Sequence, residues 1–187
     1  MGVTVGKQAH HTSGMRGVMI RQAVEDDAEA IAAVCTRAAS RAYAGLVTDE
    51  YVARVVAHFH APARVRREVA PAEGWFGFAV AECDQQVVGA AGTGRSAHDA
   101  SACELYTLHV DPPHQREGVG RALVAHSVAQ ARVAGARHLD VAVMPGNMGA
   151  IRFYQACGFV AAGDRPIYAP HGEEGGPAVA LVFMRRL

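Results

Sequence analysis

Residues 104–123 read ELYTLHVDPPHQREGVGRAL, and this segment joins a strand to a helix. The first seven residues combine β-branched, aromatic and apolar side chains in a short run, which predicts a strand over residues 104–110. The prolines at positions 112 and 113 end that strand, because proline donates no hydrogen bond to a sheet. Gly118 and Gly120 then precede apolar residues spaced four apart, so we expect a helix to begin at this turn and to extend to about residue 134.

The turn between this strand and helix has the composition of an anion-binding loop. Glycine carries no side chain to block a ligand, and the first N–H groups of a helix have no partner within it. These groups form a cradle for phosphate, and Arg116 and Arg121 flank it with donors of charge-assisted hydrogen bonds. The same glycines also suit a purely structural interpretation, in which they only let the helix begin close against the sheet. The turn alone leaves both interpretations open.

The rest of the chain alternates between helical and strand patterns. Apolar residues at helical spacing predict helices after the acidic residues 25–27, from the N-cap residue Thr48, and from Asn147 to the glycine at 158. Strands are predicted over residues 19–23, 75–83, 85–94, 138–144, 159–162 and 178–184, and the prolines at 62 and 71 enclose a polar connector. This order predicts an α/β (α+β) fold, a mixed sheet with helices on its faces.

Composition narrows the classes of function. The 187 residues are 50% hydrophobic and suit one domain, and 18 basic residues balance 18 acidic ones. Zero net charge argues against a dedicated nucleic-acid binder, which carries a basic excess. The sequence has neither a run near the ~20 apolar residues of a membrane helix nor a signal peptide. We therefore expect a cytoplasmic protein without nucleic-acid or membrane partners, with residues 1–17 a flexible extension and residues 18–187 the folded domain.

A second segment, residues 147–159 with the sequence NMGAIRFYQACGF, follows the predicted strand at 138–144. Taken together, the two segments resemble the GNAT superfamily of N-acetyltransferases. The turn QREGVG matches the superfamily's Q/R-x-x-G-x-G/A signature after a strand that ends in L-x-V-D-P, and the second segment matches N-x-x-A-x-x-F-Y-x-x-x-G-F. The resemblance covers about residues 75–162. It implies a single-domain, mixed, mostly antiparallel and splayed sheet, an acyltransferase activity, and acetyl-CoA as co-substrate.

The resemblance also implies which residues hold acetyl-CoA. The pyrophosphate rests on the turn, formed by Gln115, Arg116, Glu117, Gly118, Val119, Gly120 and Arg121. The pantetheine arm lies beside Leu108, His109 and Val110, where a splay created by a bulge frees an N–H near Val110 to polarise the thioester carbonyl. Asn147 caps the second helix and reaches the pantetheine.

Two residues are candidate catalysts of direct acetyl transfer to an amine. Tyr154 matches the superfamily's tyrosine near the coenzyme A sulfur, and a phenol with a pKa of about 10 is protonated at neutral pH and can protonate a leaving thiolate. Glu104 is the candidate base, directly or through water, because an ammonium must lose a proton before its nitrogen attacks. The alternatives are a core tyrosine and an ordinary polar strand residue. His109 is a weaker candidate base, since strict alternation puts it opposite Glu104 unless a bulge intervenes.

Other sequence motifs are weaker evidence of function. Residues 89–96, GAAGTGRS, differ from a P-loop by one residue but precede a predicted strand instead of a helix. His58 and His60 point apart on a helix and cannot share a metal ion. The four cysteines show no CxxC spacing, so we expect free thiols in a reducing compartment, no covalent cysteine route and no metal.

The acceptor is the least determined part of the prediction. We expect it to contact residues 41–45, 95–101 and 164–177, where the groups suited to a cationic amine are Tyr43, Tyr168, His171, Glu173 and Glu174. A small-molecule amine is favoured over a peptide amine, in a monomer or a homodimer. Two other functions stay open: an acyl-CoA-binding regulatory module without efficient turnover, and a P-loop nucleotide-binding protein.

Overall fold

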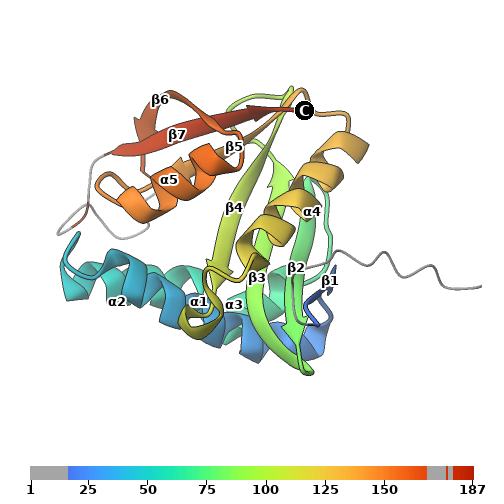
Figure 1. Ribbon diagram of the computed structural model, residues 1–187, viewed down its shortest axis with the longest axis vertical. Coiled ribbons are helices and arrows are strands. Elements are labelled where there is room, and N and C mark those ends of the chain that lie inside the picture. Colours follow the sequence, from blue (N-terminus) through green and yellow to red (C-terminus); the bar gives the residue numbers. More distant parts are fainter. Residues whose placement is uncertain (1–16, 168–175, 177–178) are drawn as a thin grey trace, which may run out of the picture.

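The computed structural model describes residues 17–167, 176 and 179–187, which form a seven-stranded sheet with helices on both faces (Figure 1). The strand order is β1-β2-β3-β4-β5-β7-β6, and neighbouring strands are antiparallel except for β4 and β5. The strands are β1 (Met19–Gln22), β2 (Trp75–Cys83), β3 (Gln86–Arg95), β4 (Ala102–Val110), β5 (His138–Val143), β6 (Val160–Pro166) and β7 (Val179–Arg186). The predicted fold class, a mixed and mostly antiparallel sheet flanked by helices, is confirmed.

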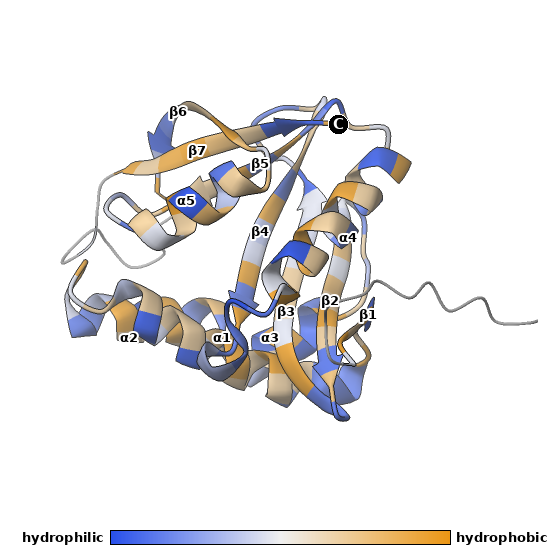
Figure 2. Cartoon of the chain, viewed as in Figure 1, coloured by the Kyte–Doolittle hydropathy of each residue, from blue (hydrophilic) through white to orange (hydrophobic). Residues whose placement is uncertain are grey.

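Different helices cover the two faces of the sheet. The set consists of α1 (Ala28–Tyr43), α2 (Asp49–Phe59), α3 (Pro62–Glu68), α4 (Val119–Val133) and α5 (Met148–Ala156), with 3-10 turns η1 (Glu25–Asp27) and η2 (Pro112–His114). α1 and α3 pack on one face of β2 and β3, whereas α4 crosses the other face and α5 lies against β5 and β7 (Figure 1). Both α4 and α5 alternate between hydrophobic and hydrophilic bands in Figure 2, as amphipathic helices on a sheet do.

The sheet is interrupted in β4. Gly92 of β3 pairs with Thr107 while its neighbour Thr93 pairs with Leu105, so Tyr106 is an extra residue on β4 and forms a bulge. The parallel pairing of β4 with β5 covers only residues 102–104 and 138–140, although both strands continue beyond it. The sheet therefore splays after Glu104, and the second half of β4 has no partner on its β5 side.

One prediction about local structure is wrong and one is confirmed. The segment between the prolines at 62 and 71 contains helix α3, because Pro62 occupies the first turn, where its missing N–H costs nothing, and Val65 is buried in the core. Residues 89–95 of the P-loop-like motif lie inside strand β3, and β4 follows it after a short connection, so no helix begins there. That arrangement removes the P-loop alternative, because a P-loop needs a helix N-terminus for its phosphates.

Several predicted features fall outside the part of the chain that the structure describes. They are the extension up to residue 16 and the loop side chains of Tyr168, His171, Glu173 and Glu174. Among the residues that are described, no helix has the length and apolar character needed to cross a membrane.

Candidate active site

The turn before α4 presents a row of backbone donors. The backbone is left-handed at Arg116, with φ 70°, and at Gly118, with φ 90°, and Gly118 is the N-cap of α4. Gly118 has no side chain to cap this helix, so the N–H groups of its first turn have no side-chain acceptor on the N-cap residue. Left-handed residues that alternate with right-handed ones also turn successive N–H groups to one side. The backbone of the turn thus suits an anion, the binding of which stays a prediction, and Arg116 and Arg121 are exposed beside it.

Two contacts fix the position of this turn. The amide of Gln115 donates a 3.0 Å hydrogen bond to the carbonyl oxygen of Val110 at the end of β4. Arg37 of α1 donates to both carboxylate oxygens of Asp111, at 3.0 and 2.6 Å, and lowers the pKa of that carboxyl. A bidentate arginine–carboxylate pair defines orientation as well as distance, so α1 aligns the start of the turn.

The N-terminus of α4 lies close to α5. A Cβ atom on Gly120 would lie 3.1 Å from Cζ of Phe153 and 3.7 Å from Cγ2 of Val110. Glycine at this position therefore lets α4 approach both sides of the splay, the end of β4 and helix α5. This supports the structural interpretation of Gly120, while Gly118 has the left-handed backbone that glycine adopts at low cost.

Tyr154 lies on α5 at the inner side of the splay. It is 7% exposed, and its ring packs edge-on against Phe153 and Phe159, with centroid distances of 5.2 and 5.4 Å. Burial, and after it the neighbouring Tyr43 and Cys157, raise the pKa of Tyr154 above the usual range of a phenol. The hydroxyl is therefore fully protonated at neutral pH, as a proton donor must be. Asn147 caps the same helix as predicted, since its Oδ1 accepts a 3.0 Å hydrogen bond from the N–H of Ala150.

Glu104 lies where β4 and β5 separate. Its carboxylate is 2% exposed, and Oε1 accepts a hydrogen bond from Arg165 of β6, a contact that joins the two sides of the splay. Oε2 is buried and makes no hydrogen bond within the described part of the chain. A buried carboxylate oxygen without a donor is costly, so this atom is available to a water, an amine or another proton donor.

Further titratable groups adjoin Glu104 on β5. Asp140 pairs with Glu104 in register, and burial, opposed by His138, raises the pKa of its carboxyl. Oδ1 of Asp140 lies 3.5 Å from Nε2 of His138, which is 3.4 Å from Oδ2 of the exposed Asp99. These groups extend from the vertex of the splay toward solvent. The sequence analysis did not single out Asp140, although a lone carboxylate within the apolar run HLDVAV was a visible signal.

The bulge changes the surroundings of His109. With Tyr106 as an extra residue, Glu104 and His109 face the same side of the sheet, whereas Leu108 and Val110 face α4. The imidazole of His109 contacts His60, with ring centroids 5.0 Å apart, and burial lowers its pKa to about 3. Its side chain thus packs between β4 and the helices. The sequence predicts a contact of His109 with acetyl-CoA. Because the imidazole is buried, this contact can involve only the backbone of His109.

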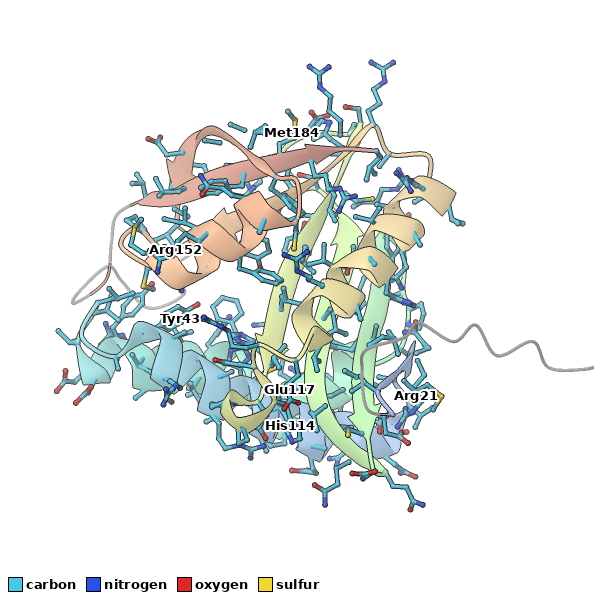
Figure 3. The ribbon with its side chains drawn as sticks, viewed as in Figure 1. Arg21, Tyr43, His114, Glu117, Arg152 and Met184 are labelled. Carbon is cyan, nitrogen blue, oxygen red and sulfur yellow. The ribbon has the colours of Figure 1, made fainter. Side chains whose placement is uncertain are left out.

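The end of α1 borders the region that the sequence predicts for the acceptor. Tyr43, labelled in Figure 3, lies on the side of α1 and α2 that faces α5, and burial together with Tyr51 raises the pKa of its hydroxyl. Tyr43 interacts electrostatically with Tyr154, so the end of α1 lies near the candidate acid. His114 and Glu117, also labelled, lie at the turn before α4, where Nδ1 of His114 is 3.6 Å from Oε2 of Glu117.

Comparison with known proteins identifies relatives that are acetyltransferases. The sequence model of the Acetyltransferase (GNAT) family matches residues 43–159. The chain is 38% identical over 66 residues to the [ribosomal protein bS18]-alanine N-acetyltransferase of Escherichia coli (strain K12), covering 35% of this chain and 45% of the relative. It is 33% identical over 124 residues to the mycothiol acetyltransferase of Cellulomonas flavigena, covering 60% of this chain and 35% of the relative. The matched regions therefore span less than half of these curated relatives.

Solved structures with the same fold extend over almost the whole chain. The PaiA N-acetyltransferase of Thermoplasma acidophilum in complex with coenzyme A superimposes with a TM-score of 0.77 at 17% identity, over 91% of this chain and 99% of that one. The ribosomal-protein-S18-alanine N-acetyltransferase of Escherichia coli superimposes with a TM-score of 0.64 at 20% identity, over 90% and 93% of the two chains. At these identities the comparison supports the fold.

Proposed function

Because the chain belongs to the acetyltransferase (GNAT) family, we propose that it is an enzyme that transfers the acetyl group of acetyl-CoA directly to an amine. The observation that carries the proposal is the separation of β4 from β5 beside a helix N-terminus without a side-chain cap. The first feature offers room for a thioester between two strands, and the second offers donors to a pyrophosphate at the end of one of those strands. A regulatory module that binds acyl-CoA without turnover would use the same two features.

In the proposed complex, the N–H groups of residues 115–120 bind the pyrophosphate. Arg116 and Arg121 add charge-assisted hydrogen bonds to it. The pantetheine arm follows Leu108, His109 and Val110 and reaches Asn147. The unpaired β5 side of β4 supports this path, since an N–H near Val110 has no partner from β5 to compete with the thioester carbonyl. No metal takes part in these steps.

The proposed reaction includes a proton transfer from the acceptor amine and another to the leaving thiolate. The ammonium of the acceptor gives a proton to Oε2 of Glu104, directly or through water, and the neutral nitrogen then attacks the thioester carbon. The oxyanion of the tetrahedral intermediate is stabilised by the N–H near Val110. When the C–S bond breaks, Tyr154 gives its proton to the leaving thiolate. The nitrogen is positively charged after the attack and loses its second proton as the amide forms, directly or through water, to the phenolate of Tyr154, which restores the phenol, and solvent removes the proton on Glu104.

We propose a small-molecule amine as the acceptor. The relatives with printed substrates differ in kind, one being a ribosomal protein and the other mycothiol, so homology leaves the choice open. The aromatic ring of Tyr43 beside Tyr154 supports a cationic amine, which an aromatic face attracts. The thiols of Cys35, Cys103 and Cys157, which form no disulfide, support a reducing, cytoplasmic setting as part of the same proposal.

A thiol-release screen with acetyl-CoA tests the function. Polyamines, amino acids, aminoglycosides and short peptides are offered in turn, and amine-dependent release of coenzyme A is expected with a small amine. A rise in melting temperature with acetyl-CoA but no release with any amine would support the regulatory module instead. Absence of any thermal shift at saturating acetyl-CoA would remove both functions.

The cradle is tested at Gly118, for which Gly135 is a matched control. Both glycines are left-handed, with φ 90° and 74°, and they lie at opposite ends of α4. Valine strains the backbone at either position, so both variants lose stability. Gly118→Val is expected to raise the Kd of acetyl-CoA by about 10-fold or more, since each lost hydrogen bond to a charged group is worth ~1.5–3 kcal/mol. Equal Kd values for Gly118→Val and Gly135→Val, measured by calorimetry, would argue against a pyrophosphate site at this turn.

A further inference from the structure

Three side chains of metal-binding type converge on the face of the sheet opposite α4. Cys35 lies on α1, His60 follows the last residue of α2, and His109 lies on β4. Cys35 is 1% exposed and His60 is 7% exposed, so two of the three are buried. Apolar residues of α1, α3, β2 and β3 surround Cys35. A polar group in such surroundings needs a partner, and these three residues have one another.

The distances suit a shared ligand. One donor atom from each residue, the sulfur of Cys35 and a ring nitrogen of His60 and of His109, lies within 4.8 Å of the other two. The centre of a triangle with sides of 4.8 Å is about 2.8 Å from each corner, and zinc bonds are ~2.0–2.1 Å to nitrogen and ~2.3 Å to sulfur. A displacement of at most about 0.5 Å for the sulfur and about 0.8 Å for each nitrogen, within reach of small side-chain rotations, therefore closes the coordination sphere.

The imidazoles carry no charge that would oppose a cation. Burial lowers the pKa of His60 to about 4, opposed by a hydrogen bond with the backbone of Phe59 and aided by Arg64, and burial with a smaller effect of His60 lowers the pKa of His109 to about 3. Each ring therefore has a nitrogen lone pair at neutral pH, and the rings are nearly perpendicular at 86°, so the two lone pairs can be aimed at one point from different directions. Imidazole and thiolate together are ligands that zinc prefers.

We infer that Cys35, His60 and His109 form a binding site for one transition-metal ion, with zinc as the metal that their chemistry fits best. One thiolate and two imidazole nitrogens hold the ion, and a water completes the four positions. On binding, the S–H bond of Cys35 breaks, the sulfur bonds to the metal and the proton goes to solvent.

The ion joins segments that are far apart in the sequence. His109 lies between Leu108 and Val110, so the metal holds the second half of β4 to α1 and to the end of α2. That half of β4 lacks a partner on its β5 side, and the metal fixes it from the face of the sheet. This site could not be predicted from the sequence, because Cys35, His60 and His109 lie far apart along the chain. The ligands are brought together only by the bulge and by the packing of α1 on the sheet.

Cobalt(II) is the probe for the site, because it occupies zinc sites and absorbs light where zinc does not. The full chain is freed of metal with a chelator and titrated with Co²⁺. Binding of one ion per chain with a thiolate-to-cobalt band in the near ultraviolet is expected. Cys35→Ala loses the band, whereas Cys157→Ala retains it. A wild-type protein without the band, or a band that survives in Cys35→Ala, would overturn the proposal.

Zinc affinity gives a second measurement that does not depend on the cysteine variant. His60→Gln is expected to weaken Zn²⁺ binding by more than about 100-fold, since residues that merely orient ligands already contribute 10–100-fold. His126→Gln on α4 is the control and keeps the wild-type affinity. If a variant fails to fold, the melting temperature of the wild type decides: Zn²⁺ raises it if the site exists, and no rise would refute the site. None of these readouts requires acetyl transfer.

Discussion

The two faces of β4 are built from different kinds of side chain. Toward α4 the strand presents Cys103, Leu105, Leu108 and Val110, which belong to or pack on the apolar core around Leu123. The opposite face carries Glu104, Thr107 and His109. On the first face the side chains only fill space. On the second, buried polar groups meet particular partners, Arg165 for the glutamate and His60 for the histidine.

The bulge at Tyr106 creates this division. In a regular strand the apolar residues at 105 and 108 would face opposite sides, and Leu108 would share a face with Glu104. One extra residue reverses the alternation, so that the apolar residues gather toward α4 and the polar ones on the other side. The face toward α4 therefore mainly contributes apolar packing, whereas the opposite face carries the candidate base Glu104. Substitutions on each face should therefore affect different measurements.

The largest effect is expected from Glu104→Gln on the polar face. The variant keeps the shape of the side chain but has no carboxylate to accept the ammonium proton, so kcat should fall by ~10²–10⁴-fold. The pH–rate profile should move to higher pH, because the reaction then depends on amine that is already neutral in solution. Glu82→Gln, at the far side of the sheet, is the control and keeps the wild-type profile. An unaltered profile in Glu104→Gln would assign proton removal to another group.

Leu123→Ala probes the apolar face and should act on stability. Leu123 is fully buried on α4, and truncation of such a leucine lowers the free energy of unfolding by ~2–5 kcal/mol through lost burial and the cavity left behind. Well below the melting temperature, kcat should be unchanged. Val133→Ala, at a residue that is 91% exposed on the same helix, should change stability by less than ~0.5 kcal/mol. Loss of kcat in folded Leu123→Ala would show that the two faces are coupled.

Much of this division was predictable from the sequence. Apolar periodicity predicted the seven strands, and Asn147 and Thr48 were correctly identified as caps because each accepts a hydrogen bond from a backbone N–H three residues on. Helix α3 was missed because its seven residues are too few for a clear period, and its apolar side is defined only by packing on α1.

The bulge and the side-chain partners were harder to predict. In the run CELYTLHV, apolar residues recur at intervals of two, three and two, and the interval of three is the sign of an extra residue at Tyr106. The partners of the polar face have no such local sign. Arg165 lies 61 residues from Glu104, and His60 lies on a helix that only the fold brings to β4. Contacts of this kind depend on the tertiary arrangement, which periodicity does not encode.

Tyr154→Phe tests the candidate acid, with a smaller expected effect. The phenylalanine preserves packing with Phe159 but cannot protonate the thiolate, so kcat should fall by about 10- to 100-fold while the Kd of acetyl-CoA stays the same. The effect is modest because a thiolate, with a conjugate pKa of ~8.5, is a good leaving group. Single-turnover kinetics separate the chemical step from release. Wild-type rates in Tyr154→Phe would exclude it as the acid, and Tyr43→Phe then becomes the variant to measure.

The smallest effect is expected far from both faces of β4, at Asp27. Arg21 donates to both oxygens of this buried carboxylate, at 2.7 and 2.9 Å, and these hydrogen bonds lower its pKa. A carboxyl with a lowered pKa in the folded state stabilises the protein above its unfolded pKa of ~3.8, and this contribution disappears as the pH falls through the folded value. Asp27→Asn should therefore destabilise the protein by about 1–2 kcal/mol at pH 7, because Arg21 is partly exposed, and by less at pH 3.

Denaturant unfolding at both pH values measures the difference, with the exposed Asp26→Asn as control. Equal destabilisation at the two pH values would show that the charge of Asp27 does not contribute, and kcat should be unaffected at either.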